Sequence, residues 1–459
     1  MYDTASMSFA IPYPANAAFM LFLALATPSA AAIFSPQQQT PALEHNRAVE
    51  LNNQGLALYG QGKVDDAILM YRQALAIDPS FEEALSNLGV ALDSQGRDDE
   101  AVADFDTALK LAPTDAVAAS NRGMALYHQR KYSDAIDAYK LAIQIHPNLP
   151  QAYNGMGAAL FAEGRVDDAV AAYHQALALS PKYADALNNL GAALNAQQKW
   201  DDAAGVFERA LALEPKSADI RANYAVALAG AGRDDDAIAV YREVVAAKPA
   251  DAAAWSALGQ LQYKQNQMAG AAESLQKSLD LNPRQPEAEF HLAGAFQSQG
   301  KLPEALAAYQ RGLALDPANP HALYNLGNAY MAMNNPRDAE AQYRKAVAAL
   351  PDFPEAELAL GAAQASAGEL DAAEATLRNL AARHPENPDA QFNLGNVLFN
   401  KGRWAPAADA YRASIRLRPD FAHAHYNLGM TLLRLNDAKT AAQEFQAANR
   451  LDPSLKPPQ

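Results

Sequence analysis

The sequence predicts an all-α fold in which twelve helical hairpins follow one another along the chain. Three observations support this prediction: a proline recurs every 34 residues, an alanine recurs in the same register, and apolar residues follow helical spacing within each interval. Half of the 459 residues are apolar, so the chain has enough apolar side chains for a long, continuous core. We therefore expect a solenoid of stacked helix-turn-helix repeats.

The recurring proline defines the repeat unit. If this proline is taken as place 32 of the unit, the first repeat begins at Ala48 and the twelfth ends at Leu455. The repeats then occupy residues 48–455 and leave residues 456–459 as a tail. The intervals contain no insertion or deletion, and the prolines are Pro79, Pro113, Pro147, Pro181, Pro215, Pro249, Pro283, Pro317, Pro351, Pro385, Pro419 and Pro453.

Other places in the unit repeat with the same period. Place 20 is alanine in all twelve repeats, place 8 is glycine in ten, and place 24 is aromatic in ten, as at Tyr71 and Phe105. Small residues at places 8 and 20 would let two helices approach closely, and the aromatic ring would fill the space beside the crossing. In the fifth repeat we expect the two helices at residues 184–197 and 200–213.

Residues that favour turns and helix ends agree with this division. Glycines at positions 62, 96, 164, 232, 300, 368 and 402 are expected to end the first helix in a left-handed conformation. Acidic pairs such as Asp65-Asp66 and Asp167-Asp168 could be mistaken for paired catalytic carboxylates. Because they recur with the repeat, we interpret them as the opening turn of the second helix, where negative charge complements the helix dipole.

Small residues at places 8 and 20, an aromatic residue at 24 and proline at 32 resemble the tetratricopeptide repeat (TPR) family over residues 48–455. The chain departs from the family at place 11, where leucines such as Leu58 and Leu92 replace the frequent tyrosine and keep the apolar contact. The resemblance implies a right-handed superhelical solenoid with the first helices lining a concave groove. It also implies a scaffold that binds other proteins.

Asparagine occupies place 6 in eight repeats, on the face of the first helix that the family turns toward the groove. An asparagine amide can donate to a carbonyl and accept from an N–H, so a row of them could bind the backbone of an extended peptide. The row resembles the asparagine ladder in the repeat region of O-linked N-acetylglucosamine transferase. Alternatively, the amides bond neighbouring helices. The residues are Asn53, Asn87, Asn121, Asn189, Asn223, Asn325, Asn393 and Asn427.

The ladder alone would bind weakly, so the hypothesis needs anchoring side chains. Eight hydrogen bonds at roughly 1 kcal/mol each give about 8 kcal/mol at best, whereas association costs at least about 4 kcal/mol. Aromatic residues at place 12 could supply the anchors, although rings at helical spacing also commonly belong to a core. These residues are Tyr59, Tyr127, Phe161, Tyr263 and Phe399.

The ladder is interrupted at Gly155, Ala257, His291 and Ala359, and repeats seven and ten lose their place-24 aromatic. A softer central region could therefore divide the surface into two grooves. The twelfth repeat also differs, since Asn449 replaces the apolar residue found at place 28 of the other eleven. We expect the array to end there and the protein to be mostly monomeric, with end-to-end association through that face as the alternative.

Composition excludes several functional classes. The net charge of −15 disfavours nucleic acid and favours basic or neutral protein partners. The chain has no cysteine and no recognisable nucleophile, metal-ligand or phosphate-loop motif, so we expect no enzymatic activity, cofactor or metal site. The sequence predicts a protein–protein interaction scaffold that binds extended peptide segments. The alternative is a non-catalytic recruiting subunit of a glycosyltransferase or of an envelope assembly complex.

The N-terminal segment has a different composition. An apolar run at residues 17–26, a proline at position 28 and small residues up to position 32 are typical of a cleaved secretion signal, although no basic residue precedes them. The uncharged stretch is also long enough to span a bilayer. We expect residues 1–32 to be a signal peptide or membrane anchor and residues 33–47 to be a linker. The protein would then be periplasmic, extracellular or membrane-anchored, and cytoplasmic if the leader is not a signal.

Overall fold

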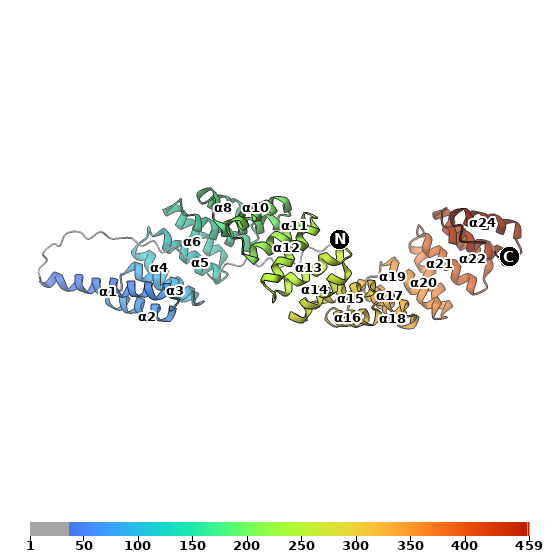
Figure 1. Ribbon diagram of the computed structural model, residues 1–459, viewed down its shortest axis with the longest axis horizontal. Coiled ribbons are helices and arrows are strands. Elements are labelled where there is room, and N and C mark those ends of the chain that lie inside the picture. Colours follow the sequence, from blue (N-terminus) through green and yellow to red (C-terminus); the bar gives the residue numbers. More distant parts are fainter. Residues whose placement is uncertain (1–35, 457, 459) are drawn as a thin grey trace. The chain divides into compact units, whose positions relative to one another are not determined.

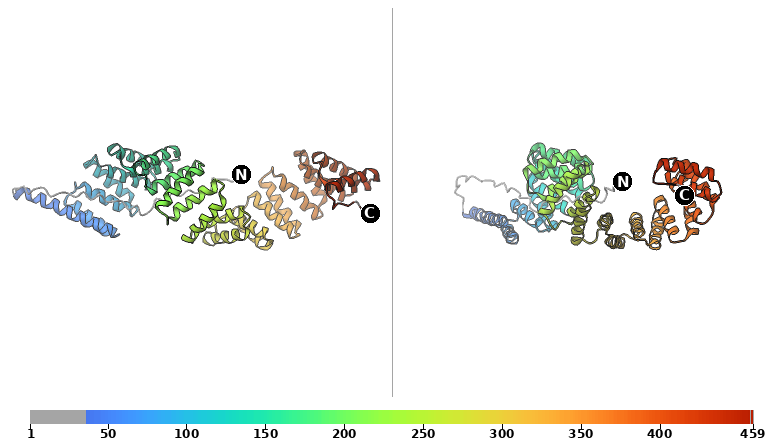
Figure 2. Two further views of the ribbon diagram at one scale, coloured as in Figure 1. Left: turned by 45° about the horizontal axis from the view of Figure 1, so that its top comes forward. Right: turned by 45° about the vertical axis from the view of Figure 1, so that its right-hand side comes forward.

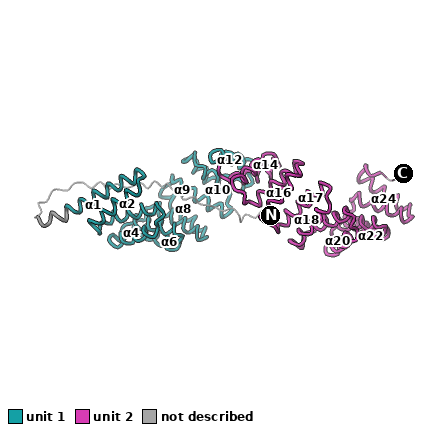
Figure 3. The backbone as a smooth tube through the Cα atoms, turned by 90° about the horizontal axis from the view of Figure 1, so that it is seen from below, with its two compact units in different colours: residues 1–249 teal, residues 250–459 magenta. Residues whose placement is uncertain are grey.

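The computed structural model describes residues 36–456 and residue 458, and within them every regular element is a helix (Figure 1). The all-α prediction is confirmed. The 24 described helices form twelve consecutive hairpins, and the chain divides into two compact units at residue 249 (Figure 3). The division falls in the loop at the end of the sixth repeat, next to the region where the sequence departs from its pattern.

The first unit contains six hairpins. Its helices are α1 (Pro36–Gly60), α2 (Val64–Ile77), α3 (Glu82–Asp93), α4 (Asp98–Leu111), α5 (Ala116–His128), α6 (Tyr132–Ile145), α7 (Pro150–Ala162), α8 (Val166–Leu179), α9 (Ala184–Ala196), α10 (Trp200–Leu213), α11 (Ala218–Gly230) and α12 (Asp234–Ala247). The fifth hairpin, α9 and α10, matches the predicted ranges to within one residue.

The second unit repeats the arrangement. Its helices are α13 (Ala252–Lys264), α14 (Met268–Leu281), α15 (Pro286–Ser298), α16 (Leu302–Leu315), α17 (Pro320–Ala332), α18 (Pro336–Ala349), α19 (Pro354–Ser366), α20 (Leu370–Arg383), α21 (Pro388–Asn400), α22 (Trp404–Leu417), α23 (Ala422–Arg434) and α24 (Ala438–Leu451). In both units the hairpins lie side by side in sequence order (Figure 2).

Within each unit the first helices of neighbouring repeats approach one another. Helix α5 contacts α7, α7 contacts α9 and α9 contacts α11, whereas the second helices of neighbouring repeats have no comparable contacts. A stack in which one set of helices is closer together than the other must curve toward the closer set. The first helices therefore lie on the inner side of the curve in each unit, as the family resemblance implied.

The glycine at place 8 permits the close crossing within a hairpin. A Cβ atom at Gly157 would lie 2.6 Å from Cε1 of Tyr173, the place-24 aromatic of the same repeat. The ring of Tyr173 is fully buried, and Ala169 at place 20 is 0% exposed. Backbone, alanine and aromatic ring thus fill one space between the two helices, which is the packing that the sequence predicted.

The turn between the two helices adopts one conformation in all twelve repeats. The seven predicted turn glycines have φ between 71° and 84°, and hydrogen bonds from Gly62 N to Tyr59 O and from Lys63 N to Leu58 O close the first helix. The same place is left-handed in the other five repeats, although it is not glycine. These residues are Arg130, Gln198, Asn266, Asn334 and Asn436. The acidic pairs also lie in the opening turns of the second helices, as expected.

The start of the array differs from the prediction of a linker at residues 33–47. Helix α1 begins at Pro36, so residues 36–47 extend the first helix of the first repeat. Three of its twelve residues are glutamine, which favours helix, and Pro36 occupies the first helical position, where proline is tolerated. The predicted signal or anchor at residues 1–32 lies outside the described residues. Among the described helices, none has the length and apolar character needed to cross a membrane.

Candidate functional site

Three of the five place-6 asparagines in the first unit link neighbouring repeats. Nδ2 of Asn87 donates to Oδ1 of Asn52 at 2.9 Å, and Nδ2 of Asn189 donates to Oδ1 of Asn154 at 3.0 Å. In both pairs the acceptor stands at place 5 of the preceding repeat. The same bond joins Asn223 to Asn188 at 3.0 Å. The amide N–H groups therefore hold first helices together, which is the alternative that the sequence left open.

The place-6 asparagines of the first unit differ in how accessible their amide oxygens are to a ligand. Asn121 and Asn189 are only 4% and 5% exposed, so a peptide could not reach them without moving a neighbour. Asn87 and Asn223 are half-buried, and within the described residues their Oδ1 atoms accept no hydrogen bond. Asn53 in the first repeat is exposed. In this unit the row can therefore offer acceptors at Asn53, Asn87 and Asn223.

The three place-6 asparagines of the second unit are half-buried and follow no common pattern. Asn427 donates to Oδ1 of Asn396 at 2.8 Å, whereas Asn393 donates to the carbonyl of Asp389 in its own helix at 3.0 Å. Asn325 is the third. The place-5 partner is lost because this place is aromatic or leucine from the eighth repeat onward, as at Phe290. Among the described residues, the bond to a place-5 asparagine one repeat earlier therefore occurs at Asn87, Asn189 and Asn223, all in the first unit.

The aromatic residues proposed as anchors are half-buried and pack against the core of their own unit. Tyr127 and Phe161 contact one core cluster, and Tyr59 contacts the cluster of the first two repeats. The ring of Phe399 meets Trp404 edge-on, with the centroids 5.0 Å apart. Tyr263 meets His291 in the same way at 5.4 Å. Each ring thus has a structural contact and is only partly buried.

Charge is distributed unequally between the two units. Residues 1–249 carry 30 acidic and 18 basic side chains, a net charge of −12, whereas residues 250–459 carry 22 acidic and 19 basic side chains, a net charge of −3. The first unit, which holds the three bonded place-6 asparagines, therefore has the stronger attraction for a basic partner.

In the second unit several carboxylates are neutralised inside the array. Glu289 pairs with Arg311 through two bonds of 2.7 Å. Glu374 has an 11% exposed side chain and contacts Lys401 at 2.6 Å and Arg403 at 2.7 Å. The hydrogen bond from Lys401, followed by bonds from the neighbouring arginines, lowers the pKa of Glu374 to about 2. These ion pairs join helices and do not form an open charged site.

The last helix borders a shallow cavity at the end of the second unit. Its volume is about 450 Å³, and its lining includes Leu433, Phe445, Asn449 and Pro458. Asn449 is exposed, and its Nδ2 lies 3.5 Å from the carbonyl of Pro453. The end face therefore combines an apolar recess with a polar residue at the place where the other repeats are apolar.

The sequence contained a signal for the inter-repeat bonds that place 6 alone did not show. Asparagine also occurs at place 5, at Asn52, Asn154 and Asn188, and each of these precedes a place-6 asparagine one repeat later. The distance of 35 residues is one repeat plus one residue, which brings the two amides together only when the first helices pack side by side. A search for polar residues at this offset would have identified the pairs.

Family models confirm the repeat assignment. Models described as "TPR repeat" match residues 123–164, 157–197 and 294–334, and models described as "tetratricopeptide repeat" match residues 52–116, 194–261, 252–285, 324–388, 360–420 and 400–455. Together they cover most of the chain. The chain belongs to the tetratricopeptide repeat family, whose members are scaffolds for protein–protein interaction. No curated protein sequence matches it significantly.

Several solved structures are similar to parts of the chain. The crystal structure of YrrB, described as a TPR protein with an unusual peptide-binding site, is 25% identical over 40% of this chain and 94% of its own, with a TM-score of 0.35. The crystal structure of MamA is 28% identical over 36% of this chain and 95% of its own, with a TM-score of 0.34. The crystal structure of the APC/C hetero-tetramer Cut9–Hcn1 is 14% identical over 91% of this chain and 96% of its own, with a TM-score of 0.40.

Proposed function

We propose that this protein is a scaffold whose first unit binds extended, basic segments of other proteins along its first helices. The observation that carries this proposal is the row of place-6 asparagines on helices that lie on the inner side of the stack. Asn87 and Asn223 have their N–H groups bound to the preceding repeat, which orients each amide and leaves Oδ1 free to accept a backbone N–H.

Net charge and backbone hydrogen bonds would make different contributions to peptide recognition. Hydrogen bonds to a peptide backbone are indifferent to side chains and contribute roughly 1 kcal/mol each, so three acceptors cannot offset the cost of association. The net charge of −12 in residues 1–249 would increase the association rate and favour lysine-rich or arginine-rich segments. The half-buried rings of Tyr59, Tyr127 and Phe161 would add apolar contact.

The proposal predicts a defined effect of substitution in a peptide-binding assay. Fluorescence anisotropy would compare wild type with Asn53→Ala/Asn87→Ala/Asn223→Ala, using an array of unstructured 15-residue peptides that carry net charges of +4 or −4. We expect wild type to bind a subset of the basic peptides and the triple variant to bind them at least tenfold more weakly. Asn148→Ala, at an exposed loop asparagine, is the matched control and should retain wild-type affinity.

Equal binding of the triple variant and wild type would contradict the proposed surface. Far-UV circular dichroism at the assay temperature must show that all variants are folded, because Asn87 and Asn223 also join repeats. If the same peptides bind only the second unit, the assignment to the first unit is wrong.

The proposal also covers the localisation of the protein, which the N-terminal leader would determine. We propose that residues 1–32 direct the protein out of the cytoplasm, either as a cleaved signal or as an anchor. Cell fractionation and sequencing of the mature N-terminus would test this, since a cytoplasmic protein with an intact leader would contradict export. Recovery of a transferase in a pull-down with mature protein would instead support the role of a recruiting subunit.

A further inference from the structure

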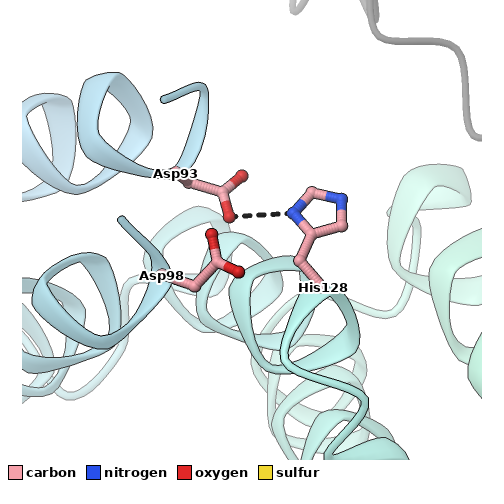
Figure 4. A group of neighbouring side chains, drawn as sticks. All are labelled: Asp93, Asp98 and His128. Atoms are coloured by element: carbon pink, nitrogen blue, oxygen red, sulfur yellow. Dashed lines mark hydrogen bonds and ion pairs between the residues drawn. The ribbon is translucent and has the colours of Figure 1, made fainter. Parts of the chain in front are cut away.

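Three metal-ligating side chains converge where the second repeat meets the third. Asp93 is the last residue of α3, Asp98 is the first residue of α4, and His128 is the last residue of α5. One potential ligand atom from each side chain lies within 4.8 Å of the others. Figure 4 shows the two carboxylates and the imidazole directed toward one another, with Asp93 Oδ1 2.9 Å from His128 Nδ1.

The three residues are departures from the repeat pattern. Asp93 is the only acidic residue among the twelve at place 12, and His128 is the only histidine at place 13. At place 17 most repeats have an apolar or aromatic residue, whereas Asp98 is acidic. Three unusual residues from different places of the unit thus meet at one junction, although the pattern that specifies the fold requires none of them.

Buried polar atoms without a hydrogen-bond partner from the protein gather at the same junction. Oδ1 of Asp98 is one of them, and both side-chain amide atoms of Gln129, the neighbour of His128, are two more. Buried polar groups in proteins are nearly always bonded. The carboxylate of Asp98 therefore points to a ligand that the protein itself does not supply.

The electrostatics of the group favour a cation. Asp93 and Asp98 place two carboxylates at one site, where like charges repel each other. The imidazole of His128 donates its Nδ1–H to Oδ1 of Asp93 at 2.9 Å. A divalent ion would relieve the repulsion between the carboxylates and would use the imidazole as a neutral ligand.

We propose that Asp93, Asp98 and His128 form a binding site for a divalent transition-metal ion of the zinc class, which bridges the second and third repeats. One imidazole and two carboxylates are ligands that Zn²⁺ accepts, with water completing a tetrahedral set. Ligand atoms in such a site are about 3.3 Å apart, so the widest pair must approach by roughly 1.5 Å. Rotation of the His128 and Asp98 side chains would supply this movement.

A bound ion would join three helix ends from two adjacent repeats. It would link the turn of the second repeat, between α3 and α4, to the C-terminal end of α5. Because neighbouring repeats contribute most of each other's stabilising contacts, an ion at this junction would slow the opening of both. The proposal is independent of peptide binding, since it concerns the turn between helices and not the place-6 row.

Isothermal titration of full-length protein with ZnCl₂, after removal of metals with EDTA, tests the proposal. We expect wild type to bind one equivalent with a Kd in the micromolar range or below, and Asp98→Asn and His128→Gln to bind at least tenfold more weakly. His384→Gln is the matched control, because His384 lies 3.2 Å from Asp352 and represents another histidine beside a carboxylate. This variant should titrate like wild type.

No thiolate competes for zinc because the chain has no cysteine, and comparison of the variants with wild type accounts for binding by the eight other histidines. Absence of zinc binding by wild type, or equal binding by wild type and both site variants, would overturn the proposal. Hydrogen exchange provides a second measurement if one variant does not fold. Zinc should slow amide exchange in α3, α4 and α5 of wild type at least fivefold, and unchanged exchange there would equally overturn it.

Discussion

Substitution of Asn189 by alanine would distinguish the structural role of the asparagine row from its role in binding. Asn189 is 5% exposed, and its Nδ2 donates to Oδ1 of Asn154 at 3.0 Å. The change removes a hydrogen bond of about 1 kcal/mol and leaves a buried acceptor unsatisfied, which costs about 1–3 kcal/mol. The 3.5 Å contact between Asn154 Nδ2 and Tyr183 Oη does not replace the lost donor.

We expect a loss of about 2 kcal/mol, restricted to the fourth and fifth repeats. In a stack where each repeat contacts only its neighbours, destabilisation stays local, so a global melting curve would underestimate it. Hydrogen exchange with mass spectrometry resolves the effect. About 2 kcal/mol corresponds to roughly 30-fold faster exchange in α7 to α10, under conditions in which reclosing outpaces exchange.

Two companion variants make the test specific. Asn53→Ala alters an exposed place-6 asparagine in the first repeat and should change local stability by no more than about 0.5 kcal/mol. The double variant Asn154→Ala/Asn189→Ala should cost less than the sum of the two single changes, because no buried partner is left unsatisfied. If Asn189→Ala exchanges at the wild-type rate, the inter-repeat bond contributes nothing and the reasoning is refuted.

Three further predictions follow from the packing, the ion pairs and the end face. Gly157→Ala should destabilise the protein by about 1–3 kcal/mol because its Cβ would lie 2.6 Å from the buried Tyr173 ring. Gly205→Ala should instead stabilise the protein by about 0.5–1 kcal/mol because no atom lies within 4 Å of the added Cβ. A higher Tm for Gly157→Ala than for Gly205→Ala would contradict the packing. Glu374 has its pKa lowered to about 2 in the folded state, so its contribution to stability is present above the unfolded pKa of roughly 4.3 and is lost as pH falls through about 2. The Tm of wild type should therefore fall more steeply from pH 5 to pH 2 than that of Glu374→Gln, and parallel curves would be evidence against the ion pairs. Asn449→Leu should increase self-association measured by light scattering, because it extends the apolar lining of the end cavity, and an unchanged mass would argue against end-to-end contact through this face.

The fold was predictable because every hairpin repeats the same pattern of residues at the same places. Periodic glycine, alanine, aromatic residues and proline identify the helices, their crossing and their turns, and α10 begins and ends at the predicted residues. The left-handed turn at Arg130 and Gln198 was less visible, since neither residue is glycine. There the conformation is set by the register of the two helices on either side, which outweighs the local preference of the residue.

The candidate site was only partly predictable. Sequence spacing placed the asparagines on the inner helices, but it could not show that Asn121 and Asn189 are buried while Asn87 and Asn223 keep an available oxygen. That difference depends on which residue the preceding repeat presents at place 5, across a helix–helix contact 35 residues away. Asp93, Asp98 and His128 were likewise separated by a turn and a helix, and no local motif joined them.

The sequence by itself determined the number of repeats, their helices and the family, because these depend on short-range periodicity that each 34-residue unit carries in full. Tertiary structure decided which polar side chains bond one another, which remain exposed, and where three side chains that could hold a metal ion meet. These properties arise only at the junctions between repeats, where the relative position of two helices determines whether two polar atoms lie 3 Å apart or on opposite sides of a helix.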